Sequence, residues 1–210
     1  MKKISWLIPV LFTLVMLGVA ISLGFAVRNS NEYAFKIQRE NMELMYEGAR
    51  ADLVESIDST IRIYAPTTCM NGLEILRQCE KYGVDVFFVL SQAHKESHFA
   101  TKGMAAKTNS AFNVYAYDGY SFNKINKDGK FSHPDLSIEP YLKLLTSRYL
   151  VDKTEMDLMR NYVDINGNRY ASSTEYENDL IEIYQMYITN KRLMKTYQLY
   201  TKYKILAGKQ

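Results

Sequence analysis

Cysteine and proline are scarce in this chain. Of its 210 residues, 2 are cysteine and 4 are proline. Cys69 and Cys79 lie across a predicted helix, where a separation of ten residues corresponds to about 15 Å, beyond the reach of a disulfide. An exported domain of this chain must therefore depend on its apolar core, with a disulfide between chains as the open alternative.

Motifs for phosphate, metal and nucleophilic chemistry are also missing. The sequence has no glycine-rich phosphate loop and no Ser or Cys nucleophile motif. His94 and His98 are four residues apart, but no HExxH order accompanies them, which argues against that kind of metal site. Residues 126–129 resemble part of a calcium loop, yet Lys124 occupies the place of its first acidic ligand. We therefore expect neither a metal nor a cofactor.

A long apolar run follows two lysines at the N-terminus. Residues 4–27 carry no charge, and about 20 apolar residues suffice to span a bilayer as a helix. Lys2 and Lys3 precede the run and only Arg28 directly follows it, which favours a cytoplasmic N-terminus. We predict a transmembrane signal-anchor over residues 1–29, with the rest of the chain in the periplasm or outside the cell.

Two alternatives to a permanent membrane anchor remain open. Gly24, Phe25 and Ala26 place small residues at positions suited to signal cleavage, so a secreted protein is one alternative. The other is a signal that later leaves the membrane, a layout that resembles that of some phage lysins.

Residues 31–64 match the pattern of one amphipathic helix. They contain no proline, and Gly48 is their only glycine. Apolar residues recur there at spacings of three or four: Met42, Met45, Ala49, Leu53, Ile57, Ile61 and Tyr64. We predict a helical stalk over residues 30–65 that holds the rest of the chain away from the membrane. The alternative is a helix packed on the domain or in a homodimer.

Glu96 is the main candidate for chemistry. Apolar residues at helical spacing follow Asp85, which is suited to cap a helix. Glu96 would lie near the C-terminal end of that helix, at its negative pole and next to Phe99, and both influences disfavour the ionised carboxylate. A protonated carboxyl can supply the proton that a leaving sugar oxygen needs. The alternative is an ordinary solvated glutamate.

Two stretches of the sequence carry a family resemblance. From Glu96 to Val114 the chain reads ESHFATKGMAAKTNSAFNV. It resembles, in register and without a gap, the signature ESGWGTSxLAxxxNNLFGI of the bacterial glucosaminidase family (glycoside hydrolase family 73, lysozyme-like superfamily). Residues 169–176, RYASSTEY, resemble the second signature of that family, YATDPxYA. The order of the two stretches also agrees with the family.

The resemblance covers residues 71–188 and includes departures from the first signature. His98 and Asn113 replace glycines, and Ser110 replaces an asparagine. These changes concern substrate fit more than the chemistry, because the glutamate and the first tyrosine of the two signatures are retained.

The resemblance implies a mainly α, lysozyme-like α+β fold, in which a helical catalytic domain carries a small β-hairpin lobe. Residues 112–117 and 120–125, joined by Asp118 and Gly119, match a hairpin pattern. We assign residues 66–189 to this domain.

The resemblance further implies a peptidoglycan hydrolase. It would be an endo-β-N-acetylglucosaminidase that cleaves the β-1,4 bond between N-acetylglucosamine and N-acetylmuramic acid in glycan strands. Glu96 would be the general acid, and Tyr170 would line the cleft and help to stabilise charge at the sugar. A second acid, Asp118 or Asp128, is needed only if water is activated directly rather than by attack of the substrate's N-acetyl group. The residues expected to contact substrate are Phe99, Asn109, Phe112, Tyr115 and Tyr117.

Two other functions remain as alternatives. A lytic transglycosylase shares the superfamily and a lone glutamate, but it cuts at the other sugar and leaves an anhydro end. A non-catalytic scaffold that binds peptidoglycan would keep the fold without the chemistry.

Residues 190–210 form a basic C-terminal helical tail with a charge of +6, from six Lys or Arg and no acid. Residues 31–64 contain seven acids and four bases, a charge of −3. The tail could pack on this acidic helix, attract an anionic membrane or wall polymer, or be solvated. Nucleic-acid binding is not expected, because the domain between these segments is net negative and the chain is predicted to be exported.

Overall fold

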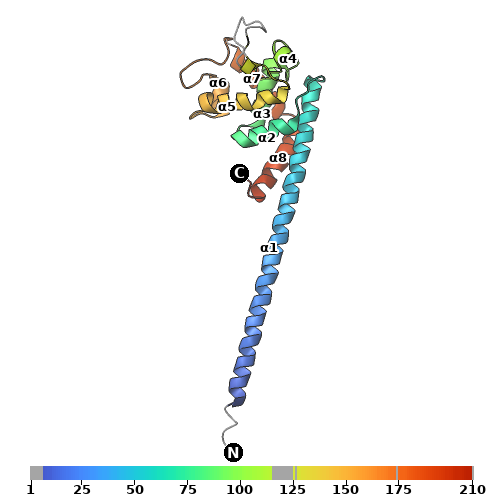
Figure 1. Cartoon of the computed structure of the whole chain (residues 1–210), viewed down its shortest axis with the longest axis vertical. Coiled ribbons are helices and arrows are strands. Elements are labelled where there is room, and N and C mark those ends of the chain that lie inside the picture. The colour runs from blue at the N-terminus through green and yellow to red at the C-terminus, as the bar shows by residue number, and fades with distance from the viewer. Residues whose placement is uncertain (1–6, 115–124, 126, 174, 210) are drawn as a thin grey trace, which may run out of the picture. The chain divides into compact units, whose positions relative to one another are not determined.

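The structure is a computed structural model that describes residues 7–114, 125, 127–173 and 175–209 (Figure 1). Within its first helix it describes no side chains at residues 7–15, 24, 26, 27 and 29. Residues 1–48 and 202–210 form one compact unit, and residues 49–201 form the other.

The described residues are mainly helical, as predicted. The segments η2 and η3 are 3-10 helices and η4 is a π-helix. In chain order the helices are α1 (Leu7–Tyr64), α2 (Gly72–Tyr82), α3 (Val86–Ser97), α4 (Ala105–Thr108), η2 (Lys127–Gly129), η3 (Pro134–Ser137), α5 (Ile138–Leu144), η4 (Leu145–Tyr149), α6 (Glu155–Arg160), α7 (Tyr176–Ile188) and α8 (Lys191–Leu206).

The predicted β-hairpin lobe is not supported by the described residues. They contain no β-strand and one isolated antiparallel bridge, between Val163 and Arg169. Residues 115–124, which make up most of the predicted hairpin, lie outside the described residues. Residues 112–114 do not form the start of a strand, because Asn113 adopts a φ of 50°, in the left-handed region.

Helix α1 is continuous at residues 29 and 30, where the predicted anchor and stalk meet. Over the residues that the structure describes, no helix has both the length and the apolar character needed to cross a membrane. The transmembrane helix predicted over residues 1–29 is therefore not supported.

The C-terminal part of α1 belongs to the core of the second unit. Leu53 and Ile57 are fully buried there. Gly72 begins α2 so close to α1 that a Cβ atom at this position would lie 2.8 Å from the carbonyl oxygen of Val54. Glycine is thus the residue that lets the two helices approach. Residues 49–64 therefore pack on the domain, which is one of the alternatives to a free stalk.

Helix α3 packs against α7 and α2 in the second unit (Figure 1). Asp85 caps α3, since its carboxylate accepts a hydrogen bond of 2.8 Å from the N–H of Phe88. Gly83 ends α2 in the left-handed conformation, with a φ of 67°. The cap at Asp85 is as predicted from the sequence. The two caps fix where the helix that carries Glu96 begins.

Residues 191–201 of α8 (Lys191–Leu206) pack within the second unit. Leu193 is fully buried and Tyr200 is 5 % exposed. The Tyr200 hydroxyl donates a hydrogen bond of 2.9 Å to Glu80 of α2, and Arg192 forms an ion pair of 2.7 Å with Glu55 of α1. The ion pair with Glu55 supports packing on the acidic helix among the three alternatives for the basic tail.

We expect truncation after Thr189 to destabilise the protein, because it removes Leu193 and Tyr200 from the core. Loss of one large buried apolar side chain costs about 2–5 kcal/mol, and thermal unfolding measures the change. Deletion of residues 207–210 alone is the matched control, since it keeps both side chains. Equal melting temperatures for the two truncated chains would contradict this account.

Candidate active site

Glu96 lies in the last turn of α3, and its side chain is partly buried. The same helix buries Phe88, Leu90 and Ala93 completely. This apolar face fixes the orientation of α3, so the carboxyl of Glu96 is held by a helix that cannot turn without exposing its core residues.

A strained turn follows Glu96 directly. Residues 98–100 all have positive φ, with values of 47°, 57° and 63°, a conformation that is uncommon outside glycine. Ser97 stabilises the turn: its hydroxyl donates to the carbonyl of Ala111 and accepts from the N–H of Ala100, each over 2.7 Å. His98 and Asn113 stand where the family signature has glycine, and both have positive φ. Glycine adopts positive φ without steric cost, which is why it suits these two positions.

Two side chains donate hydrogen bonds to the Glu96 carboxyl. The Tyr176 hydroxyl donates to Oε1, and Asn113 Nδ2 donates to Oε2 over 3.1 Å. Asn113 Nδ2 also donates to the backbone carbonyl of Glu96 over 3.0 Å. Because a carbonyl can only accept, this second hydrogen bond fixes which end of the Asn113 amide faces Glu96. The carboxyl is therefore held at both oxygens.

Burial raises the pKa of the Glu96 carboxyl above its usual value. The hydrogen bonds from Tyr176 and Asn113 and the charge of Lys95 lower the pKa without cancelling the rise. The direction agrees with the prediction from the sequence, and its main cause is burial. A raised pKa keeps more of the carboxyl protonated toward neutral pH, which is the form a general acid needs.

The second signature brings two tyrosines to this carboxyl. Tyr176 begins α7 and contacts Glu96 directly, whereas the Tyr170 hydroxyl donates to the carbonyl of Phe112 over 2.8 Å. The rings of Tyr170 and Tyr176 lie 5.9 Å apart. Burial and the charge of Glu96 raise the pKa of Tyr170 well above its usual range, so its phenol stays neutral and able to donate.

Asp164 organises the loop that delivers Tyr170. Its Oδ1 accepts hydrogen bonds from the N–H groups of Asn166 and Asn168, over 2.8 and 2.9 Å. Its Oδ2 accepts from Arg148 Nη2 over 2.6 Å. Burial raises the pKa of Asp164, but the hydrogen bonds outweigh it and lower the pKa to about 2. The loop therefore depends on an ionised carboxylate.

We expect Asp164→Asn to lower both the stability and the activity, because the amide introduces a donor where only acceptors fit. The wild-type carboxylate stabilises the fold fully above the ordinary aspartate pKa of about 3.9, and this contribution is lost as the pH falls toward about 2. Thermal unfolding as a function of pH should show this acid-side loss in the wild type and less of it in the variant. Asp152→Asn, at an exposed residue with a φ of 55° that asparagine tolerates, is the control. Identical pH dependence for wild type and Asp164→Asn would contradict the assignment.

Two of the residues predicted to contact substrate lie in the core. Phe99 and Phe112 are fully buried. The Phe112 ring stacks on Tyr141 with ring centres 4.0 Å apart, and its carbonyl accepts the hydrogen bond from Tyr170. In this structure the two phenylalanines support the site from within.

The remaining predicted contact residues and the two candidate second acids lie in different surroundings. Asn109 Nδ2 donates to the carbonyl of Phe131 over 3.0 Å, and Asn109 lines a pocket of about 180 Å³ together with residues 67–69 and 99–101. Asp128 is exposed on η2. Three predicted residues lie outside the described residues: Tyr115, Tyr117 and Asp118.

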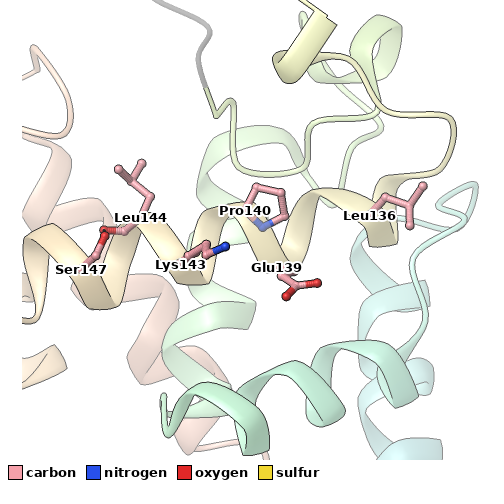
Figure 2. Close-up of a pocket in the computed structure, with 6 residues that line it drawn as sticks. All are labelled: Leu136, Glu139, Pro140, Lys143, Leu144 and Ser147. Atoms are coloured by element: carbon pink, nitrogen blue, oxygen red, sulfur yellow. The ribbon is translucent and has the colours of Figure 1, made fainter.

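A larger pocket, of about 630 Å³, lies along η3, α5 and η4 (Figure 2). Glu139 in its lining forms an ion pair of 2.6 Å with Lys81 and accepts a hydrogen bond of 3.1 Å from Tyr82. The hydrogen bond from Lys81 lowers the pKa of Glu139, so this carboxyl is ionised and unsuited to donate a proton. The lining is formed by Leu136, Glu139, Pro140, Lys143, Leu144 and Ser147.

The sequence patterns did not nominate Tyr176 or Asn113 as site residues, although both contact Glu96. The signal for Tyr176 was present, since it is the second tyrosine of the second signature. Asn113 was noted only as a departure from the first signature. Its role depends on a left-handed backbone that turns the amide back toward the end of α3.

A comparison with protein families matches the part of the chain that carries this site. The sequence model of the glucosaminidase family, described as mannosyl-glycoprotein endo-beta-N-acetylglucosaminidase, matches residues 73–189, which is more than half of the chain. Neither a curated protein nor a solved structure matches the chain significantly. The matched region contains Glu96 and both described residues that hydrogen-bond to its side chain, Asn113 and Tyr176. The chain belongs to the glucosaminidase family.

Proposed function

We propose that this protein is an endo-β-N-acetylglucosaminidase that cleaves the β-1,4 bond between N-acetylglucosamine and N-acetylmuramic acid in peptidoglycan, with Glu96 as the general acid. The family match supports a glycoside hydrolase acting on peptidoglycan in general. The observation that carries the finer proposal is the partly buried carboxyl of Glu96, whose pKa is raised and whose two oxygens both receive hydrogen bonds.

The first step is proton transfer to the leaving sugar. Glu96 donates its proton to the glycosidic oxygen as the bond between that oxygen and C1 of N-acetylglucosamine breaks. Glu96 is left as a carboxylate, and its hydrogen bonds from Tyr176 and Asn113 strengthen as this charge develops. Tyr170 acts on the same step indirectly, since it holds the carbonyl of Phe112, the residue before Asn113.

The nucleophile in this proposal is the substrate's own N-acetyl group. Its carbonyl oxygen attacks C1 and forms a cyclic intermediate, which water then opens while the Glu96 carboxylate takes up the proton. In the described part of the chain, the Glu96 carboxyl hydrogen-bonds to Tyr176 and Asn113 and to no second carboxyl. Direct activation of water by Asp118 or Asp128 is the other route to the same product.

The proposal includes the location of the protein. Peptidoglycan lies outside the cytoplasmic membrane, and the uncharged run over residues 4–27 after Lys2 and Lys3 supports export. Protease treatment of intact and permeabilised cells tests this location. Protection of residues 49–201 until the cytoplasm is opened would contradict export.

Digestion of purified peptidoglycan by the full chain, followed by mass spectrometry of the released muropeptides, tests the function. We expect fragments with N-acetylglucosamine at the reducing end. Anhydro-N-acetylmuramic acid ends would instead identify a lytic transglycosylase. Binding to peptidoglycan without release of sugar would identify a non-catalytic scaffold.

A further inference from the structure

Gln92 is a buried polar residue that the mechanism above does not use. It lies one turn before Glu96 on α3 and is fully buried. Its Nε2 donates a hydrogen bond to the Tyr176 hydroxyl. This amide therefore contacts the tyrosine that donates to Glu96.

The direction of the two hydrogen bonds at Tyr176 follows from the end of the Gln92 amide that faces it. An amide Nε2 can only donate, so the Tyr176 hydroxyl accepts from Gln92. The single proton of Tyr176 then points to Oε1 of Glu96.

We propose that Gln92 is a positioning residue: it fixes Tyr176 as a hydrogen-bond donor to Oε1 of Glu96 and thereby assigns the acid proton to Oε2. This role rests on the proposed function, because it concerns the proton that Glu96 transfers. Oε1 keeps its donor before and after the transfer, so no hydroxyl has to reorient as the carboxylate forms. The hydrogen bond from Asn113 to Oε2 strengthens when the proton has left.

The other charged and titratable groups near Glu96 do not set the direction of the Tyr176 hydroxyl. Lys95 forms an ion pair with Asp179 of α7. Tyr162 and Tyr170 face the carboxyl as neutral phenols, because burial raises the pKa of both well above the usual range. Gln92 therefore decides which way the Tyr176 proton points.

Replacement of Gln92 by methionine in the full chain tests the proposal, since methionine has a similar volume and no donor. Tyr176 is then free to accept the Glu96 proton, which favours the protonated carboxyl. We expect the pKa of Glu96, followed by NMR of 13C-labelled glutamate side chains, to rise by about half a unit to one unit. On peptidoglycan, kcat should fall roughly 10-fold while KM changes by less than about 2-fold.

Gln78→Met is the matched control. Gln78 is also buried, and its Nε2 donates to Glu74 on α2, away from Glu96. Among the described residues, the Oε1 atoms of both Gln78 and Gln92 have no hydrogen-bond partner. We expect this variant to leave the Glu96 pKa and kcat unchanged. Gln92→Leu serves as the second apolar variant if Gln92→Met does not fold.

An unchanged Glu96 pKa in a folded Gln92 variant would overturn the proposal. A fall in kcat that Gln78→Met reproduces would also overturn it, because the effect would then be structural. A wild-type chain that releases no sugar, but whose Glu96 pKa rises on Gln92→Met, would overturn the proposed hydrolase function while supporting this role of Gln92.

Discussion

Glu96→Gln is expected to abolish the release of sugar from purified peptidoglycan and to leave the fold intact. Glutamine keeps an oxygen that can accept from Tyr176, but it has no acidic proton to transfer. General acid catalysis contributes about 10²–10⁴-fold to a rate, so the variant should lose at least two orders of magnitude. A zymogram and a reducing-sugar assay measure the loss, and circular dichroism verifies the fold.

Glu139→Gln is the matched control for that experiment. Glu139 is also a helical glutamate of the domain, but its carboxyl is ionised and paired with Lys81. We expect this variant to digest peptidoglycan at the wild-type rate. Full activity in Glu96→Gln, or equal losses in both variants, would refute the assignment of Glu96.

Tyr176→Phe is expected to have the second largest effect. The hydroxyl stabilises the Glu96 carboxylate that forms as the proton leaves, and removal of one such donor typically costs about 10²-fold in kcat. The hydrogen bond from Tyr176 lowers the pKa of Glu96, so its loss raises that pKa further. A general acid works while it is protonated, and the alkaline limb of the pH profile should therefore move to higher pH.

Measurement of kcat across the pH range checks both effects. Tyr184→Phe on the same helix is the control, because Tyr184 is not among the residues that contact Glu96. A Tyr176→Phe chain with the wild-type rate and an unmoved alkaline limb would remove Tyr176 from the site.

The sequence predicted the features that depend on local patterns. Apolar spacing after Asp85 identified α3 and its cap, and the position of Glu96 at the end of that buried helix predicted a raised pKa. These features follow from residues close together in the chain, and helix periodicity makes them visible without tertiary information.

The partners of Glu96 could not be predicted in the same way. The choice between Tyr170 and Tyr176 depends on where the loop held by Asp164 ends and α7 begins. The contact from Asn113 depends on a positive φ and a packed turn. Such contacts arise from tertiary structure, whereas the resemblance to the family signature favoured Tyr170.

The alternatives for the basic tail also needed tertiary contacts. Its charge allowed packing, membrane attraction or solvation, and a charge pattern cannot separate these. Buried Leu193 and the ion pair between Arg192 and Glu55 decide in favour of packing.

Titration of Glu96 in the wild-type chain, by NMR of 13C-labelled glutamate, is the most direct test of the account. We predict a pKa above the ordinary glutamate value of about 4.3, and we predict that the alkaline limb of kcat/KM on peptidoglycan falls at the same pH. A Glu96 that ionises at or below the ordinary value, with activity persisting far above that pH, would contradict the claim that this buried carboxyl supplies the proton.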